Sequence, residues 1–171
     1  MRCTKVDFGV ISKQVELRGR GMSRFVVVNS TRAGLVQRVT VGPHLVQADE
    51  PIESGGMDAG PNPYELLLAA LGTSTSMTVR LYAERKQWSL QGVRVRLAHS
   101  RVHKQDAAEC ENAKGMVDRI EREISFAGDL SQAQRQRLLE IANQCPVHRT
   151  LTSAIQIHTS IIGEDSFVPA V

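Results

Sequence analysis

The stretch NPYELLLAALGTSTSMTVRLYAERK, residues 62–86, contains the strongest local structural signals in the chain. Asn62, Pro63 and Glu65 suit the N-cap, first and third positions of a helix, where the Asn and Glu side chains can satisfy each other's exposed backbone donors. The apolar run 66–71 that follows has no polar face, which is typical of a helix buried on most sides. It is far too short to span a bilayer. We therefore predict a long, largely buried helix over residues 62–86.

Strand patterns precede this helix. Residues 24–29 form a β-branched run, and residues 35–41 alternate apolar and polar side chains. Residues 44–48 predict another short strand after a Gly-Pro break. The segment 49–60 is rich in glycine and acidic residues, so we expect a loop that delivers the chain to the helix N-cap.

The sequence after the helix predicts two strands, a second helix and a last strand. Residues 91–103 and 119–126 alternate as half-buried strands do, and the polar connection 104–118 lies between them. A second capping box predicts a helix over residues 131–144. The alternation in residues 152–162 predicts a final strand.

Cys145 ends the apolar stripe of the second predicted helix. With Leu138, Ile141 and Ala142 it completes an i, i+3, i+4, i+7 pattern, so we expect its thiol to point toward the core. Pro146 is expected to stop the helix. Buried free cysteines commonly serve as small hydrophobes, so packing and chemistry are both open roles for this thiol.

The order of these elements predicts an α+β fold with mainly antiparallel pairing. We expect one domain over residues 1–171, made of N-terminal strands in 1–50, the central helix 62–86 and a C-terminal α+β part in 91–162. A helix that is apolar on nearly all sides needs more cover than one small sheet supplies. The sequence contains no internal repeat and no sign of a second domain.

The composition is that of an ordinary soluble globular protein, with 42% hydrophobic and 23% charged residues and a net charge of +3. Basic residues are spread along the chain. Arg18, Arg20 and Arg24 form a local cluster without interleaved aromatic residues, so we predict no nucleic-acid partner. The sequence has neither a signal-peptide pattern nor a membrane segment, which predicts a cytoplasmic protein without a membrane partner.

The cysteine and histidine spacings predict neither a disulfide framework nor a metal site. Cys3, Cys110 and Cys145 cannot all pair within one chain, so reduced thiols are expected. No C-x-x-C or H-E-x-x-H motif is present, and we predict no metal and no cofactor. The sequence around Ser74 is not the G-x-S-x-G motif of a nucleophilic serine.

Three motifs together carry a resemblance to a known family. HLVQADEP (residues 44–51), the helix sequence of residues 62–86 and CPVHRTL (residues 145–151) resemble, in this order, the OsmC/Ohr family of thiol-dependent hydroperoxide reductases. The likeness runs from about residue 35 to residue 162. It implies an intertwined homodimer, in which sheets from both chains wrap a pair of buried central helices. The family's site would lie at the dimer interface.

The resemblance also implies the site residues. Family members carry the reactive cysteine in the small middle segment of the central helix, where this chain has Ser74, and Cys145 matches the resolving cysteine. A peroxidase needs a thiolate that attacks the peroxide and a second thiol that resolves the sulfenic acid, and a serine hydroxyl is far too weakly acidic for the first role. We therefore expect thiol peroxidase activity, on a small organic hydroperoxide with an external dithiol reductant, to be weak or lost.

Three alternatives stay open at this point. Cys145 could attack peroxide alone, with its sulfenic acid released by an external thiol or by Cys110. The interfacial pocket could instead bind a small apolar or acyl ligand without catalysis. The protein could also act only through its dimer.

The charged partners that the resemblance implies do not fall at the matching positions of this chain. Family peroxidases have a glutamate ten residues before the reactive cysteine, a position that Tyr64 holds here, while Glu65 is one residue later. On an unbroken helix Glu65 and Ser74 face opposite ways, so capping is the first role for Glu65 and a catalytic role the second. Arg18, Arg20 and Arg38 are the candidates for the family's arginine.

Overall fold

The computed structural model describes residues 25–30, 34–103 and 115–161. Within these ranges the chain is α+β with antiparallel sheets, which confirms the predicted fold class. The predictions made for Cys3, Cys110, Arg18, Arg20 and Arg24 lie outside the described residues.

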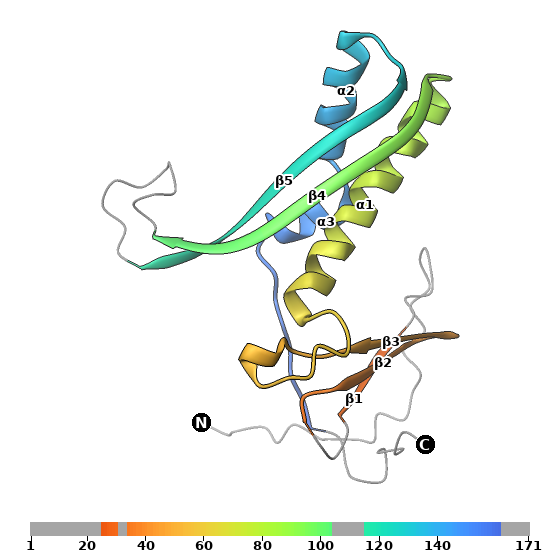
Figure 1. The fold of residues 1–171 in the computed structure, drawn as a ribbon. Helices are drawn as coiled ribbons and strands as arrows, with labels where there is room; N and C mark the ends of the chain where they lie inside the picture. The colour runs from red at the N-terminus through yellow and green to blue at the C-terminus, as the bar shows by residue number, and fades with distance from the viewer. Residues whose placement is uncertain (1–24, 31–33, 104–114, 162–171) are drawn as a thin grey trace, which may run out of the picture.

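The first sheet contains the three short strands expected before the central helix. Strands β1 (Val26–Ser30), β2 (Gln37–Val41) and β3 (His44–Ala48) pair in the order β1-β2-β3, all antiparallel. The sheet lies beside the start of the central helix (Figure 1). Its apolar side chains are largely exposed in this chain, Val26 at 60% and Leu45 at 63% among them.

Asp49 organises the loop between β3 and the central helix. Its carboxylate is 2% exposed and accepts hydrogen bonds from the backbone N–H groups of Met57 (2.8 Å) and Ala59 (3.2 Å). The bond from Met57 is the main reason that the pKa of Asp49 is below its ordinary value. The loop includes one 3-10 turn, η1 (Ile52–Ser54), which the sequence did not predict.

Helix α1 (Pro63–Arg85) is the predicted central helix, and its capping box is confirmed. Asn62 Oδ1 accepts from the backbone N–H of Glu65 at 2.9 Å, and Glu65 Oε2 accepts from the N–H of Asn62 at 2.8 Å. One chain alone buries a single stripe of this helix, so burial on most sides stays a prediction that depends on a second subunit. The other described elements pack against one side of the helix. The buried stripe on that side consists of Leu71, Thr75, Val79 and Ala83.

A long hairpin covers part of α1. Strands β4 (Ser89–His103) and β5 (Met116–Asp129) pair antiparallel, with Val95 opposite Ile124, and β5 begins earlier and ends later than predicted. Gly128 allows the two strands to approach closely, because a Cβ there would lie 2.0 Å from the carbonyl oxygen of Ser89. Its φ of +127° is also one that glycine adopts readily.

Helix α2 (Gln132–Ala142) lies alongside α1 and confirms the second predicted capping box, between Ser131 and Gln134. Arg135 fastens it to β5 by donating to the carbonyl oxygens of Phe126 (2.6 Å) and Gly128 (3.0 Å). The core lies where α1, α2 and the hairpin meet (Figure 1). Its buried members are Val79, Ala83, Leu130, Leu138 and Ala142.

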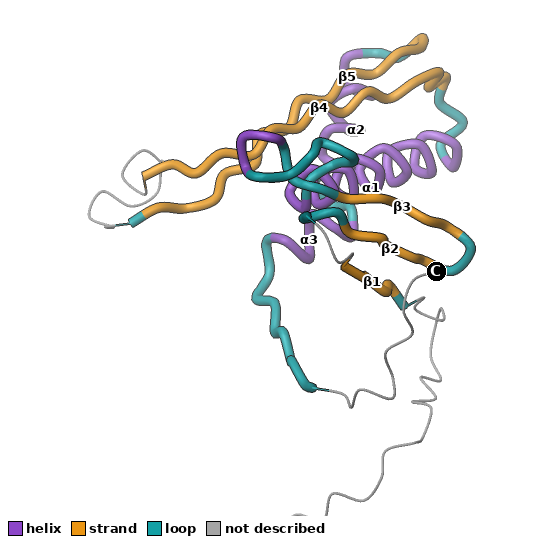
Figure 2. The backbone as a smooth tube through the Cα atoms, turned by 60° about the horizontal axis from the view of Figure 1, so that its bottom comes forward, coloured by secondary structure: helices purple, strands orange, loops and turns teal. Residues whose placement is uncertain are grey.

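The C-terminal part departs from prediction in two ways. Helix α2 ends at Ala142, before Pro146, and Pro146 instead starts a short helix, α3 (Pro146–Leu151), since proline is well tolerated at a first helical position. The predicted strand over 152–162 is absent, because residues 154–161 pair with no strand in the described chain. Figure 2 shows this segment running apart from the β1–β3 sheet. Ile155 and Ile157 are 54% and 85% exposed.

No helix in the described part of the chain is long and apolar enough to cross a membrane.

Two adjacent leucines test the position of the core. Leu138 is fully buried, whereas Leu139 is 41% exposed. We expect Leu138→Ala to lower the free energy of unfolding by about 2–5 kcal/mol, because it removes buried apolar atoms and leaves a cavity. Leu139→Ala should cost about 0.5 kcal/mol or less. Urea denaturation of both variants measures the difference. Equal losses of unfolding free energy would show that this placement of the core is wrong.

Candidate functional site

The thiol of Cys145 lies fully buried where α3 begins against the middle of α1. Cys145 is the N-cap of α3, and its Sγ accepts a hydrogen bond from the backbone N–H of His148 at 3.3 Å. Thr75 Oγ1, from α1, lies 3.5 Å from Sγ and is itself fully buried. The predicted inward orientation of this thiol is confirmed.

Ser74 and Cys145 lie together in the structure. The Ser74 Oγ accepts a hydrogen bond from the backbone N–H of Val147 at 3.5 Å, two residues after Cys145, and the nearby Ser74 hydroxyl helps to lower the pKa of the Cys145 thiol. Helix α1 and the first turn of α3 therefore bring the two positions implied by the family resemblance into one site. Ser74 is half-buried, whereas the thiol has no exposed surface.

Arg122 of β5 supplies a positive charge to this site. Its Nη1 donates to Thr75 Oγ1 at 2.9 Å and to the carbonyl oxygen of Ala142 at 3.4 Å, and its Nη2 donates to Asn143 Oδ1 at 2.6 Å. The Thr75 hydroxyl thus connects the guanidinium to the thiol. Neither Arg122 nor Thr75 was predicted from the sequence as a site residue.

A sequence signal for Arg122 was nevertheless present. Arg122 alternates in phase with Ile120, Ile124 and Phe126, the apolar face of the predicted strand. A charged residue on a core-facing position needs a partner or a function, because burying an unpaired charge is costly. Thr75 offered no comparable signal, since it is one of several small hydroxyl residues in the middle of α1.

The surroundings favour the thiolate form of Cys145. Burial, the strongest single influence, raises its pKa. The Thr75 hydroxyl, the backbone N–H of His148, the Ser74 hydroxyl and the charge of Arg122 together lower the pKa by more than burial raises it. The net effect places the pKa of Cys145 below its ordinary value. A lowered pKa increases the thiolate fraction near neutral pH, and the thiolate is the nucleophile.

The same environment also favours the deprotonated form of His148. Burial and the nearby charge of Arg122 lower the pKa of its imidazole. The ring is therefore largely neutral at neutral pH, with one N–H donor.

A pocket of about 440 Å³ adjoins this cluster. Its polar lining residues are Asp118, Arg122, His148 and Thr152, and its apolar ones are Leu71, Ile120 and Leu151. Strand β5 and helix α3 supply most of this wall.

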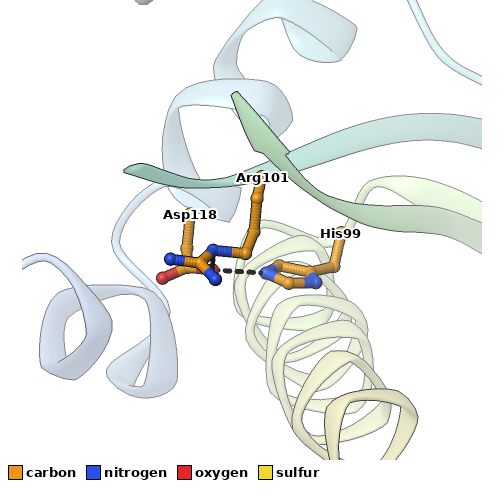
Figure 3. Close-up of polar contacts among 3 residues, drawn as sticks. All are labelled: His99, Arg101 and Asp118. Carbon is orange, nitrogen blue, oxygen red and sulfur yellow. Dashed lines mark hydrogen bonds and ion pairs between the residues drawn. The ribbon is translucent and has the colours of Figure 1, made fainter. Parts of the chain in front are cut away.

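A set of polar side chains borders the pocket at Asp118. Asp118 Oδ1 lies 3.0 Å from His99 Nε2 and 3.8 Å from Arg101 Nε, and Figure 3 shows the three side chains converging above α1. The ring of Tyr64 stacks on that of His99 with centroids 4.3 Å apart. Tyr64, at the position of the family's glutamate, thus contacts a histidine that a carboxylate already holds.

Glu65 lies apart from the thiol. Its carboxylate caps α1, and it lines a different pocket, between α1 and β4, together with Gly72 and Leu97. The described chain therefore does not bring Glu65 and Cys145 into one site. Of the three arginines considered from the sequence, only Arg38 is described, on β2. No cluster of metal-ligating side chains occurs within the described ranges.

Comparison with protein-family models assigns the chain to a family. The family model described as OsmC-like protein matches residues 55–160. The chain belongs to this family. The match includes α1, the β4–β5 hairpin, α2 and α3, and so covers every residue of the Cys145 cluster. No curated protein sequence matches the chain.

Solved structures with the same fold include OsmC-like proteins from several bacteria. An organic hydroperoxide resistance protein OsmC from Legionella pneumophila has 20% identity and a TM-score of 0.59, covering 78% of this chain and 92% of that one. An OsmC-like protein from Mycoplasma pneumoniae has 16% identity and a TM-score of 0.61, covering 77% and 89%. OhrB, the organic hydroperoxide resistance protein of Bacillus subtilis, has 15% identity and a TM-score of 0.54, covering 77% and 91%.

Thr75→Val tests the polar link between Arg122 and the thiol. Valine keeps the shape of the buried side chain and removes the hydroxyl that stabilises the thiolate, so the pKa of Cys145 should rise. The ultraviolet absorbance of the thiolate, followed against pH with Cys3 and Cys110 replaced by serine, measures this change.

Thr73→Val is the matched control. Thr73 is exposed and its hydroxyl donates to the carbonyl oxygens of Ala69 and Ala70, away from the thiol. The pKa of Cys145 should therefore stay unchanged in this variant. A lower or unaltered pKa in Thr75→Val would contradict the electrostatic role of the Thr75 hydroxyl.

Proposed function

We propose that this OsmC-like protein is of the oxidative-stress, hydroperoxide-detoxification type, and that its thiol peroxidase activity is weak or lost because Ser74 holds the position of the attacking cysteine. The observation that carries the proposal is the hydrogen bond from the backbone N–H of Val147 to Ser74 Oγ, which holds position 74 beside the helix start where the Cys145 thiol is buried. We infer that a cysteine at position 74 would approach Cys145 closely enough to react with it. In this chain only one of the two residues is a thiol.

The chemistry explains why the serine matters. A thiolate attacks the outer oxygen of a hydroperoxide, the O–O bond breaks, and the products are a sulfenic acid and, after protonation, an alcohol. A second thiol then displaces hydroxide, which leaves as water, and forms a disulfide that an external dithiol reduces. Ser74 can perform neither thiol step. Cys145 has a lowered pKa and the cation Arg122 nearby, but its burial hinders access by peroxide.

We propose that the active form is a homodimer. The described chain exposes large apolar side chains on several of its elements, which is unusual for a surface that meets only water. These residues include Phe25 and Val26 before and in β1, Tyr64 and Met77 on α1, and Ile155 and Ile157 after α3. A second subunit would cover α1 and provide a strand for residues 154–161 to pair with. A single domain spanning 1–171 and a cytoplasmic location are part of the same proposal.

A second candidate function is noncatalytic binding of a small apolar or acyl ligand. The pocket beside Arg122 favours it, because three aliphatic side chains and a few polar groups line it. This function requires no attack on a peroxide and is compatible with Ser74.

Ser74→Cys tests the main proposal. The new thiol would lie against Cys145, where the surroundings that stabilise a thiolate already exist. We expect consumption of cumene hydroperoxide, with a dithiol reductant, to rise by about a hundred-fold or more over the natural chain, equivalent to about 2.7 kcal/mol of activation free energy. Cys145→Ser in the same background should abolish the gain.

Ser76→Cys is the control for adding a thiol to α1. Ser76 lines the pocket between α1 and β4, away from Cys145, so this variant should gain no turnover. Equal turnover in the natural chain and in Ser74→Cys would contradict the proposal, as would an equal gain in Ser76→Cys.

A further inference from the structure

The pocket beside Cys145 contains an uncompensated positive charge. Arg122 is half-buried, and all its hydrogen bonds in the described chain go to neutral acceptors, on Thr75, Ala142 and Asn143. No carboxylate of the described residues lies within ion-pair distance of its guanidinium. A partly buried cation without a counter-ion favours the approach of an anion.

The single acid in this pocket does not neutralise Arg122. Asp118 already faces two other groups, His99 at 3.0 Å and Arg101 at 3.8 Å. Arg101 and His99 are the groups that the Asp118 carboxylate faces, so Arg122 is left without a carboxylate partner among the described residues. An arriving anion would find its favourable partner in the Arg122 guanidinium.

Free hydrogen-bond donors accompany this charge. Arg122 Nε makes no hydrogen bond within the described ranges, and neither does the imidazole of His148. Both residues line the pocket. A planar guanidinium edge with an imidazole N–H beside it can bind the two oxygens of a carboxylate.

The remaining walls fit a hydrocarbon chain. Leu71, Ile120 and Leu151 supply aliphatic surface, and the pocket volume of about 440 Å³ is within the range of small-molecule sites. Apolar walls beside one unpaired cation match an amphipathic ligand better than either an inorganic ion or a pure hydrocarbon.

We infer that the pocket between β5 and α3 binds a small organic carboxylate, with its carboxylate on Arg122 and His148 and its aliphatic chain against Leu71, Ile120 and Leu151. This inference rests on the second candidate function and gives the chemical class of its ligand. The carboxylate would also compete with the Cys145 thiolate for the charge of Arg122. A bound ligand would therefore disfavour ionisation of the thiol.

Octanoate and octan-1-ol are the test pair, because they share a chain length and differ in the charged group. In calorimetric titrations of the full chain, we expect octanoate to bind at least about ten-fold more tightly than octan-1-ol. Arg122→Gln should remove this preference. Arg149→Gln is the matched control, since Arg149 is exposed on α3 and lines another pocket.

A second readout does not depend on the folding of a variant. The pKa of His148 in the natural chain, followed by the proton resonances of its imidazole, should rise when octanoate is added, because a bound carboxylate favours the imidazolium. Octan-1-ol should leave it unchanged.

The outcomes separate this inference from the proposals that precede it. Equal binding of both probes overturns the carboxylate site and leaves the ligand-binding function standing, whereas binding of neither overturns both. An octanoate preference that persists in Arg122→Gln, or a His148 pKa that does not rise with octanoate, also overturns the inference. Neither probe is a peroxide, so the result is independent of turnover.

Discussion

The buried hydroxyl of Thr75 is the contact on which the arrangement of the site depends. It lies 2.9 Å from Arg122 Nη1 and 3.5 Å from Cys145 Sγ, and so joins a strand of the hairpin, the central helix and the start of α3. A guanidinium brought this far into the protein requires acceptors, and the carbonyl oxygen of Ala142 and the Asn143 side chain at the end of α2 provide the others. Strand β5, helix α1, the end of α2 and the start of α3 thus meet at one group of polar side chains beside the Cys145 thiol.

The elements that could be predicted from the sequence are those specified by local interactions. The capping boxes at Asn62 and Ser131 use residues three positions apart, and the strands of the hairpin alternate with a period of two, so both signals can be found in a short window. The end of the chain could not be predicted in this way. The alternation in 152–162 describes the side chains of a strand but not the partner it needs, and the described chain offers none.

The site could be predicted only in part, because its motifs can be recognised in short stretches and its long-range contacts cannot. Ser74 and Cys145 were identified through motif resemblance, and the packing of α1 against α3 brings them together. Arg122 was missed because it acts through a hydrogen bond to a residue 47 positions earlier. A small buried thiol next to a cation suits redox chemistry and anion binding equally. Ser74 stands where the resemblance places the first thiol, and the pocket, the charge of Arg122 and the Cys145 thiol are all present beside it.

Intact-mass analysis of Ser74→Cys, with Cys3 and Cys110 replaced by serine and one equivalent of cumene hydroperoxide added, tests the central claim most directly. The claim is that positions 74 and 145 form one two-thiol site from which a single thiol is missing. It predicts the loss of two hydrogen atoms, as an intramolecular disulfide forms, and an unmodified mass for the parent with Ser74. Two free thiols after treatment, or an added oxygen atom that never resolves into a disulfide, would contradict it.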